Sequence, residues 1–358
     1  MTEHTPPVYL NTAACGLITN PVLQTGIHLY QDFENLASAA SEHWRDVKAS
    51  EIRSNIARFI GTGAENIALI PNFSYGLNAV VQALSGQEKV LLYRKDFPSV
   101  YIPFMVNQFN IVWLDDDDGF LIDLNKIESL IKTEKIDLVA ISHVQWQSGF
   151  KIDLQALCSL CRDLGTRTII DATQSLGSVK ISVAELQPDV FIASNYKWMN
   201  AGFGTGILYM SPEFAAAYPP RISGAHSNAF QFADLSFRQN TSITNYEPGS
   251  LNMFGFSILD KAIEEKSRRG MEAIEAYNRN LTALLLRQLS VPVTGGADMQ
   301  HRSSIVVIRE ENGLHAFLVK NNIITTMRNG NIRISIHFHN TEADIEHLIQ
   351  CIADHRNA

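Results

Sequence analysis

Short apolar runs alternate with longer amphipathic stretches through the first two thirds of the chain. Gly, Pro, Asp or Asn residues bound most of the apolar runs, which is typical of strands. Helix-like segments such as Gly76–Leu84 and Leu154–Leu164 lie between them. This alternation predicts an α/β fold with a mostly parallel, doubly wound sheet and helices on both faces. The predicted strands are Ile67–Ile70, Lys89–Tyr93, Asn110–Leu114, Leu138–Ser142, Thr168–Ile170, Val190–Ala193 and Gly206–Met210.

The last third of the chain has a different pattern. A polar, loop-rich stretch at Ala215–Asn252 precedes a single long helix, which we predict from Phe256 to Leu289. We therefore expect a large domain over residues 14–252, and a smaller domain that combines an N-terminal arm, 1–13, with residues 253–358. The tail of the small domain is predicted to form strand Ser304–Ile308, helix Gly313–Asn321, strand Ile332–His337 and helix Glu342–Asp354.

The composition of the 358-residue chain narrows the possible environments and partners. Its net charge of −8 argues against nucleic-acid binding, which depends on basic patches. No apolar run approaches the roughly 20 residues that span a bilayer, and the N-terminus lacks the pattern of a signal peptide. Only four cysteines occur, which favours a reducing cytoplasm over a disulfide framework. We expect a cytoplasmic protein without a membrane or nucleic-acid partner.

Polar residues follow several predicted strands, at the sheet edge where ligands bind in parallel sheets. After Ile67–Ile70 comes a turn that contains Phe73 and Ser74 and leads into a helix. Free backbone N–H groups and the helix dipole make such a turn suitable for an anion. Taken alone, the turn fits equally well with Ser74 as a simple helix cap.

An acid and a lysine follow two neighbouring strands of the predicted sheet. Asp171 and Lys197 lie about one strand–helix–strand repeat apart, so both should reach the same edge. They form either a structural salt bridge or the pair that pyridoxal phosphate (PLP) requires, a Schiff-base lysine and an acid beside the pyridinium nitrogen. His143 also follows a strand, and is either a wall of the ligand pocket or a hydrogen-bonded structural residue.

The residues around this pair resemble those of a known family. The runs Ile169–Gln174 and Tyr196–Trp198 are similar to motifs of the class V aminotransferases, which belong to the fold-type I PLP-dependent enzymes. Tyr9–Ala14 and Ile332–Ser335 fit the same family, whose members include cysteine desulfurases, kynureninases and isopenicillin N epimerase-like proteins. The resemblance implies the fold of the PLP-dependent transferases, with a large PLP-binding domain and a smaller C-terminal α/β domain, and a homodimer.

The resemblance also implies a role for each matching residue around the cofactor. Lys197 would carry PLP as a Schiff base, Asp171 would pair with the pyridine nitrogen, and Gln174 would hydrogen-bond the ring oxygen. Phe97 would stack on the ring. The phosphate would be held by Phe73, Ser74, Tyr196 and, from the partner subunit, Ser250.

Other residues bear on the substrate and on the reaction. Arg333 would bind the carboxylate of an amino acid through two parallel bonds, and His143 is a further catalytic candidate. The segment Val291–Arg333, where desulfurases carry a reactive cysteine, contains none, which argues against persulfide chemistry. We predict an aminotransferase for an amino acid and a 2-oxo acid. Alternatives are a kynureninase-like hydrolase, an epimerase or a lyase of the family, or a non-catalytic PLP-binding member. No metal site is predicted, because Cys158 and Cys161 lack a second cysteine pair.

Overall fold

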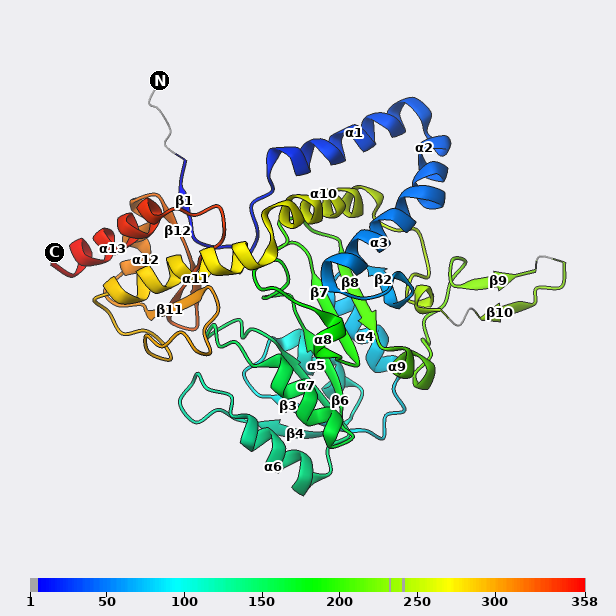
Figure 1. Ribbon diagram of the computed structural model, residues 1–358, viewed down its shortest axis with the longest axis horizontal. Helices are drawn as coiled ribbons and strands as arrows, with labels where there is room; N and C mark the ends of the chain where they lie inside the picture. Colours follow the sequence, from blue (N-terminus) through cyan, green and yellow to red (C-terminus); the bar gives the residue numbers. More distant parts are fainter. Residues whose placement is uncertain (1–5, 232, 240–241, 358) are drawn as a thin grey trace.

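Seven strands form the central sheet of the computed structural model, which describes residues 6–231, 233–239 and 242–357 (Figure 1). The strand order is β2-β8-β7-β6-β5-β3-β4, and β8 runs in the opposite direction to the other six strands. The predicted mostly parallel sheet is confirmed. The strands are β2 (Ile67–Ile70), β3 (Lys89–Tyr93), β4 (Asn110–Leu114), β5 (Leu138–Ser142), β6 (Arg167–Asp171), β7 (Val190–Ser194) and β8 (Gly206–Met210).

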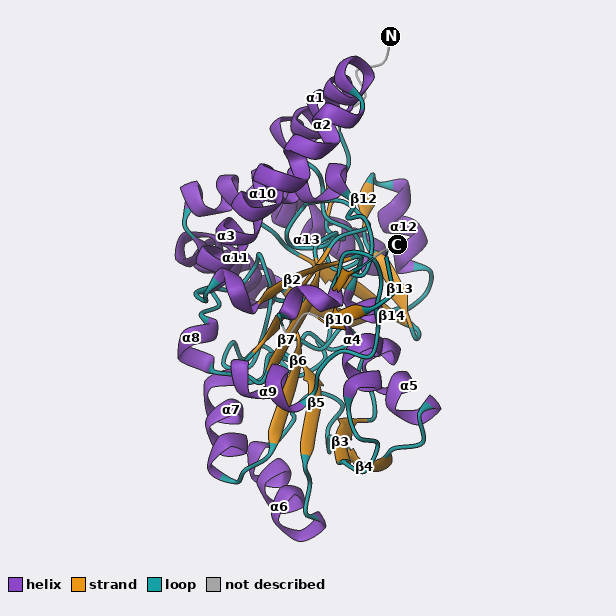
Figure 2. Cartoon of the chain, turned by 90° about the vertical axis from the view of Figure 1, so that its right-hand side faces the viewer, coloured by secondary structure: helices purple, strands orange, loops and turns teal. Residues whose placement is uncertain are grey.

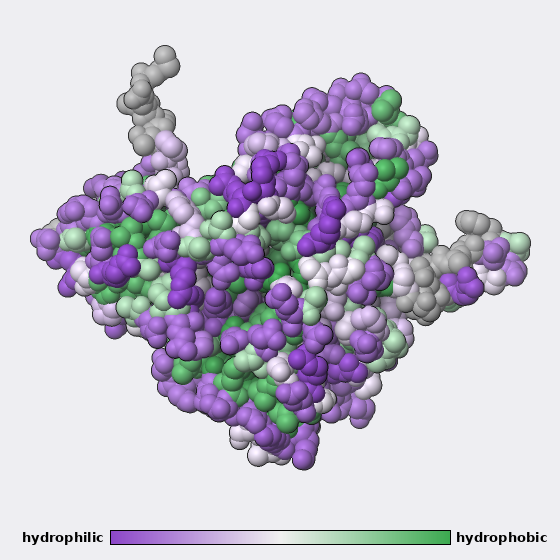
Figure 3. Space-filling model, in the orientation of Figure 1, coloured by the Kyte–Doolittle hydropathy of each residue, from purple (hydrophilic) through white to green (hydrophobic). Residues whose placement is uncertain are grey.

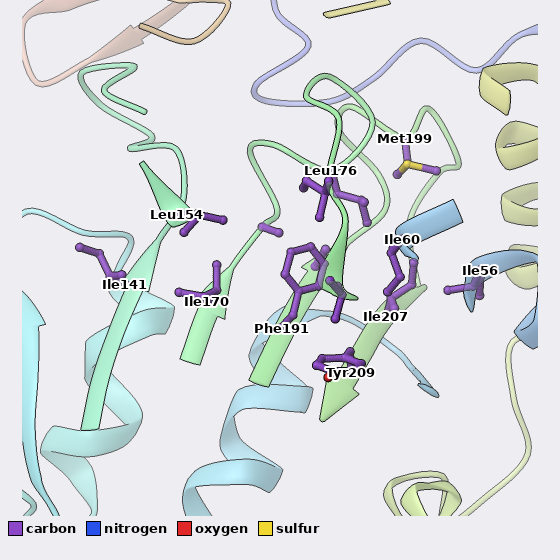
Figure 4. Packing of buried hydrophobic residues seen from close by; sticks show 14 of the residues in the cluster. Ile56, Ile60, Ile141, Leu154, Ile170, Leu176, Phe191, Met199, Ile207 and Tyr209 are labelled. Carbon is purple, nitrogen blue, oxygen red and sulfur yellow. The ribbon is translucent and has the colours of Figure 1, made fainter. Parts of the chain in front are cut away.

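Helices cover both faces of this sheet, so the sheet is doubly wound as predicted (Figure 2). Successive residues of a strand point to opposite faces and join two separate apolar cores. Figure 4 shows the first core, where Ile141, Ile170, Phe191 and Ile207 come from four neighbouring strands. The helices on this face are α3 (Ala49–Ile60), α6 (Leu124–Glu134), α7 (Leu154–Asp163) and α10 (Met253–Arg269), and those on the other are α4 (Phe73–Ala83) and α5 (Pro98–Val106).

An arm of helices projects from the sheet at the top of Figure 1 and carries exposed apolar side chains. Leu23, Ile27 and Tyr30 follow one another at helical spacing on one side of α1, and Tyr30 is 57% exposed. Figure 3 shows apolar patches on this arm. The arm consists of α1 (Asn20–Leu36), α2 (Ser38–His43) and the π-helical segment η1 (Trp44–Lys48).

The stretch Ala215–Asn252, which was predicted to be loop-rich, also contains short regular elements. Its most prominent feature is an antiparallel hairpin that extends away from the sheet (Figure 1). The short elements of this part of the chain are α9 (Pro212–Ala217), β9 (Asn228–Phe230), β10 (Phe237–Gln239) and the 3-10 segment η3 (Ile243–Tyr246). Two further short elements lie earlier, the 3-10 segment η2 (Ala64–Asn66) and α8 (Val183–Leu186).

The long helix predicted from Phe256 to Leu289 is two helices, so this prediction is wrong. α10 ends at Gly270, whose backbone has φ +82° and whose N–H closes the helix on Lys266 O at 2.9 Å. This left-handed conformation suits glycine and stops the helical ladder. The next helix is α11 (Met271–Gln288). α10 lies against α1 and α3, whereas α11 lies against the C-terminal helix.

The C-terminal part of the chain forms a separate sheet with its own apolar core. The N-terminal strand β1 pairs in parallel with β12, and these two strands form a small sheet of their own. The division of the chain into two domains at residues 13 and 252 stays a prediction. Residues 1–5 of the predicted N-terminal arm, 1–13, lie outside the described residues. None of the described helices combines the length and apolar character needed to cross a membrane. The elements are β1 (Val8–Tyr9), β11 (Ile305–Arg309), α12 (Leu314–Lys320), β12 (Ile323–Ile324), β13 (Thr326–Arg328), β14 (Asn331–Ser335) and α13 (Glu342–Asn357).

Candidate active site

A cavity of about 530 Å³ lies at the carboxyl ends of β5, β6 and β7. Its size is typical of cofactor and small-molecule sites. Residues Ser142, Asp171 and Ser194, which end these three strands, all contribute to its wall. The structure brings seven predicted site residues together here, namely Phe73, Ser74, Phe97, Asp171, Gln174, Tyr196 and Lys197.

Lys197 is a buried amine between two aromatic rings. Its Nζ lies 5.5 Å from the centroid of the Phe97 ring and 5.4 Å from that of Tyr196. Burial lowers the pKa of Lys197 to about 8, while Asp171 opposes this decrease and Arg333 adds to it. Part of the amine is therefore neutral near pH 7, and the neutral form is the one that acts as a nucleophile or a base.

The N-terminal segment holds the backbone that carries Lys197. Gly16 N–H donates to Tyr196 O at 2.8 Å, and Asn200 Nδ2 donates to Leu17 O at 2.9 Å. A Cβ atom on Gly16 would lie 1.9 Å from the carbonyl oxygen of Lys197, so a side chain at this position requires the backbone to move. The pattern of strands and helices in the sequence did not predict that this N-terminal segment contacts the site.

Asp171 ends β6 and lies opposite Ser142 in the register of β5 and β6. Its Oδ1 accepts a hydrogen bond from Thr173 N at 2.8 Å, and its Oδ2 lies 3.5 Å from Ser142 Oγ. Burial raises the pKa of Asp171 to about 6, against the opposing effects of Thr173 and Lys197. No ion pair of Asp171 occurs among the described residues. A buried carboxylate of this kind suits a cationic partner such as a protonated pyridine nitrogen.

A second buried carboxylate, Asp96, lies behind Asp171 and was missed by the sequence reasoning. Asp96 Oδ2 accepts from Ser142 N at 2.8 Å, and its Oδ1 accepts from Ser142 Oγ and from Phe97 N. Burial raises the pKa of Asp96, and its charge in turn raises that of Asp171. Asp96 thus fixes both Ser142 and the backbone of Phe97 beside the cavity. Asp96 lies just beyond the end of β3, and this position in the sequence could have indicated a site residue.

Hydrogen bonds fix the conformation of the turn before α4, where the sequence predicts an anion site. Asn72 caps the helix by accepting from Tyr75 N at 2.9 Å, and Phe73 N donates to Ser194 Oγ at 2.8 Å. The Ser74 hydroxyl donates to Ser99 Oγ at 2.9 Å. The helix cap is therefore Asn72, which removes the alternative that Ser74 serves only as a cap.

Gln174 reaches the cavity through an amide that is fixed at both ends. Its Nε2 donates to Ala13 O at 3.0 Å, and its Oε1 accepts from Trp198 Nε1 at 2.8 Å. An amide nitrogen carries two hydrogens, so one N–H of Gln174 is left for a ring oxygen.

Arg333 lies next to the cavity, behind Trp146, and does not itself line it. One guanidinium nitrogen donates to Trp146 O at 3.0 Å, while Nε is buried and has no partner among the described residues. The side chain is only 2% exposed, and burial lowers its pKa to about 10. No carboxylate pairs with Arg333 in the described part of the chain. The guanidinium is therefore available for the anion of a ligand.

His143 and Ser250 are not brought into this cavity. His143 is buried, its Nδ1 has no partner among the described residues, and burial lowers its pKa to about 3. It follows Ser142 directly, and successive residues in an extended chain point to opposite sides. Ser250 lines a separate cavity of about 440 Å³, which shares only Gly204 with the Lys197 cavity.

The comparison with known families agrees with this geometry. A model of the family described as Aminotransferase class-V matches residues 8–348. The chain belongs to the class V aminotransferase family. Enzymes of this family depend on PLP.

Different relatives of this chain are named for different activities. An uncharacterized aminotransferase of Bacillus subtilis (strain 168), YcbU, is 24% identical over 90% of this chain and 88% of its own. A probable cysteine desulfurase of Pyrococcus abyssi (strain GE5 / Orsay) is 23% identical over 95% and 92%. Family membership therefore establishes a PLP-dependent class V enzyme, and leaves the reaction to be inferred from the site.

Solved structures share the fold over nearly the whole chain. The cysteine desulfurase from Thermococcus onnurineus NA1 has a TM-score of 0.87 at 22% identity, covering 97% of this chain and 94% of its own. The cystine C-S lyase C-DES, solved with its product cysteine persulfide, has a TM-score of 0.88 at 19% identity and covers 97% of both chains. At such identities the likeness shows the PLP fold type I and not the reaction.

Proposed function

We propose that this protein is an aminotransferase that uses PLP to move the amino group of an amino acid to a 2-oxo acid. The observation that carries this proposal is the set of ionisable groups on the cavity wall. In the described part of the chain these are Asp171, Tyr196 and Lys197. Burial raises the pKa of Tyr196, so it stays protonated. With Asp171 assigned to the pyridine nitrogen, Lys197 is the side chain of this wall that remains to accept a proton near pH 7.

The cavity offers a suitable group for each part of PLP. Lys197 would hold the aldehyde carbon, Asp171 would face the pyridine nitrogen, and the start of α4 at Phe73 and Ser74 would take the phosphate. Phe97 would flank the ring. Its own ring meets Trp146 edge-on with centroids 5.6 Å apart, which fixes its orientation.

When bound, PLP supplies an aldehyde that condenses with amines and a ring that accepts the electron pair released at the α-carbon. Arg333 binds the α-carboxylate of the amino acid and so orients its α-hydrogen. Lys197 Nζ removes that proton and keeps it in a cavity with few competing bases. Asp171 stabilises positive charge on the ring nitrogen. The same amine would return the proton, so that one base serves both proton transfers of an amino transfer, and a water molecule would then release the 2-oxo acid.

Other reactions of the family are less well supported by this site. Cysteine desulfuration leaves the sulfur on a protein thiol as a persulfide, and none of the four cysteines lines the cavity. Burial raises the pKa of both Cys158 and Cys161 to about 12, which keeps these thiols protonated. Epimerisation by two opposed bases needs a second base, and His143 lies outside the cavity. His143 therefore has no step in the proposed reaction.

A spectroscopic screen tests the proposed function. The PLP-loaded protein is mixed with single amino acids, and its absorption should change from the aldehyde form to the amine form of the cofactor. Adding a 2-oxo acid should restore the first spectrum. In parallel assays, cysteine or cystine is added as the substrate, and release of sulfide, pyruvate and ammonia is measured. Release of these products without the amine form would replace the aminotransferase by a lyase.

The rate at which PLP attaches to the cofactor-free protein should rise with pH and level off above about pH 8. Only the neutral amine attacks an aldehyde, and the pKa of Lys197 is lowered to about 8, so deprotonation is complete only above that value. Stopped-flow absorbance with PLP in excess measures this rate. A rate that continued to rise toward pH 10 would show an amine with the ordinary pKa of lysine.

Replacing Arg333 by lysine should weaken binding of the substrate by roughly tenfold to a hundredfold, with little change in PLP affinity. An ammonium group cannot make the two parallel bonds of a guanidinium, and a charge-assisted bond contributes about 1.5–3 kcal/mol. Substrate and PLP titrations of the same variant separate the two effects. If both affinities fell together, Arg333 would be a structural residue of the β14 strand.

We also propose that the active protein is a homodimer in which Ser250 reaches the phosphate in the partner's cavity. Two observations support this proposal. Ser250 does not line the cavity of its own chain, and α1 exposes apolar side chains at Leu23, Ile27 and Tyr30. Sedimentation of the native protein tests the dimer, and Ser250→Ala should weaken PLP binding. Cytoplasmic location stays a prediction.

A further inference from the structure

A second guanidinium lies beside Arg333 on the ribbon formed by β13 and β14. Thr326 lies opposite Arg333, and Arg328 lies opposite Asn331. Opposite residues of antiparallel strands share a face, and so do residues two apart along one strand. Arg328 and Arg333 therefore share one face, on a diagonal of about 7–8 Å that long side chains bridge.

Neither cation has a carboxylate partner in the described part of the chain. Arg328 donates to the carbonyl oxygen of its neighbour Met327 at 2.9 Å, and Arg333 donates to Trp146 O at 3.0 Å. The Nε of Arg333 is buried and makes no hydrogen bond to any residue that the structure describes. Like charges at neighbouring positions of a sheet are unfavourable, so this pair is expected to be completed by an anion.

Both guanidiniums act on the site of Lys197. Each contributes to the lowered pKa of Lys197, and Arg328 also lowers that of Arg333. The loop 145–148 borders the Lys197 cavity through Trp146 and also borders a second cavity of about 230 Å³ through Gln145, Gln147 and Ser148. Arg328 lines this second cavity with Lys95, but Lys95 is paired with Asp116 at 2.8 Å. Of the two cations in this cavity wall, Arg328 is the one that forms no ion pair with a described acidic residue.

We propose that Arg328 binds a second carboxylate on the side chain of the substrate, so that the enzyme selects dicarboxylic amino acids. This inference rests on the proposed function, in which Arg333 holds the α-carboxylate. Two guanidiniums on one face, one buried and one at the exposed end of the ribbon, match an α-carboxylate and a distal carboxylate of the same molecule. Arg328 is then a specificity residue and takes no part in proton transfer.

Binding of unreactive acids tests the second carboxylate site without any turnover. The PLP-loaded protein is titrated with glutarate and with butyrate, which differ in one carboxylate, and the cofactor absorbance reports binding. Glutarate should bind roughly tenfold to a hundredfold more tightly, as expected for one charge-assisted contact. Arg328→Gln should remove most of this difference and leave the butyrate affinity unchanged. A difference that survives in Arg328→Gln would overturn the proposal, as would equal binding of both acids by the unchanged protein.

A matched variant controls for the loss of a positive charge from the same sheet. Arg309 ends β11, pairs in register with Asn331 and has a side chain that is 77% exposed. Arg309→Gln should keep the preference for glutarate. Arg328→Lys should retain part of it, because an ammonium keeps the charge but not the fork of donors.

Amino-acid kinetics distinguish failure of this inference from failure of the proposed function. In the unchanged protein, kcat/KM should favour glutamate over glutamine and aspartate over asparagine by at least tenfold, and Arg328→Gln should abolish the preference. If no amino acid is transaminated but glutarate binding still depends on Arg328, the aminotransferase proposal fails and the anion site stands. If neutral amino acids are transaminated equally well and Arg328→Gln changes neither assay, only the specificity inference fails.

Discussion

Replacing Lys197 by alanine should reduce kcat/KM by about a thousandfold or more and remove the covalent link to PLP. The amine provides both the attachment point and the proton acceptor, and a positioned general base alone contributes roughly 10²–10⁴-fold. No other basic side chain lines the cavity in the described part of the chain. Borohydride reduction of the unchanged protein, followed by digestion and mass spectrometry, should find the pyridoxyl group on Lys197. The same treatment of Lys197→Ala should find none.

Two other lysines serve as a control and as an alternative for this assignment. Lys180 is half-exposed and pairs with Glu272, so Lys180→Ala should keep both activity and the label. Lys266 is a buried lysine as well, but its Nζ bonds to Asn200 Oδ1 at 2.9 Å and lies 3.2 Å from His337 Nε2, away from the cavity wall. A pyridoxyl group on Lys266 would show that the amine had been assigned to the wrong buried lysine.

Strand positions could be predicted because each buried strand is a short apolar run with turn residues at both ends. Five strands begin and end at the predicted residues, and the Thr168–Ile170 strand was too short because its ends are the polar residues Arg167 and Asp171. The direction of β8 could not be predicted, since strand pairing depends on the whole sheet. The break at Gly270 could have been, because a glycine after basic residues is a common helix end.

Site residues that end strands could be predicted for the same reason. Parallel strands bring Asp171 and Lys197 to one edge, and the cavity lies there. Asp96 could not be linked to Asp171 from the sequence, because their contact through Ser142 depends on the register of β5 and β6. Arg328 was missed because its relation to Arg333 appears only in the pairing of β13 with β14.

Replacing Asp171 by asparagine should lower kcat roughly a hundredfold to several thousandfold. The amide keeps the size of the side chain but cannot stabilise a protonated pyridine, and loss of one partner from a buried ion pair costs about 3–5 kcal/mol. Rates with the best amino acid from the screen measure this effect. Asp153→Asn is the matched control, because Asp153 caps α7 by accepting from Ala156 N, and asparagine caps a helix equally well.

The same substitution should affect the stability of the cofactor-free protein in the opposite direction. Burial raises the pKa of Asp171 to about 6, above its value in an unfolded chain, so ionisation of Asp171 opposes folding at pH 7. This destabilisation is complete above about pH 6 and disappears as the pH falls toward 4. Asp171→Asn should therefore stabilise the cofactor-free protein by roughly 1–3 kcal/mol at pH 7 and by much less at pH 4. Denaturant unfolding at both pH values measures this, and PLP should stabilise the unchanged protein more than the variant. A variant that is less stable at pH 7 without PLP would mean that Asp171 is already paired within the chain and does not wait for the cation of the cofactor.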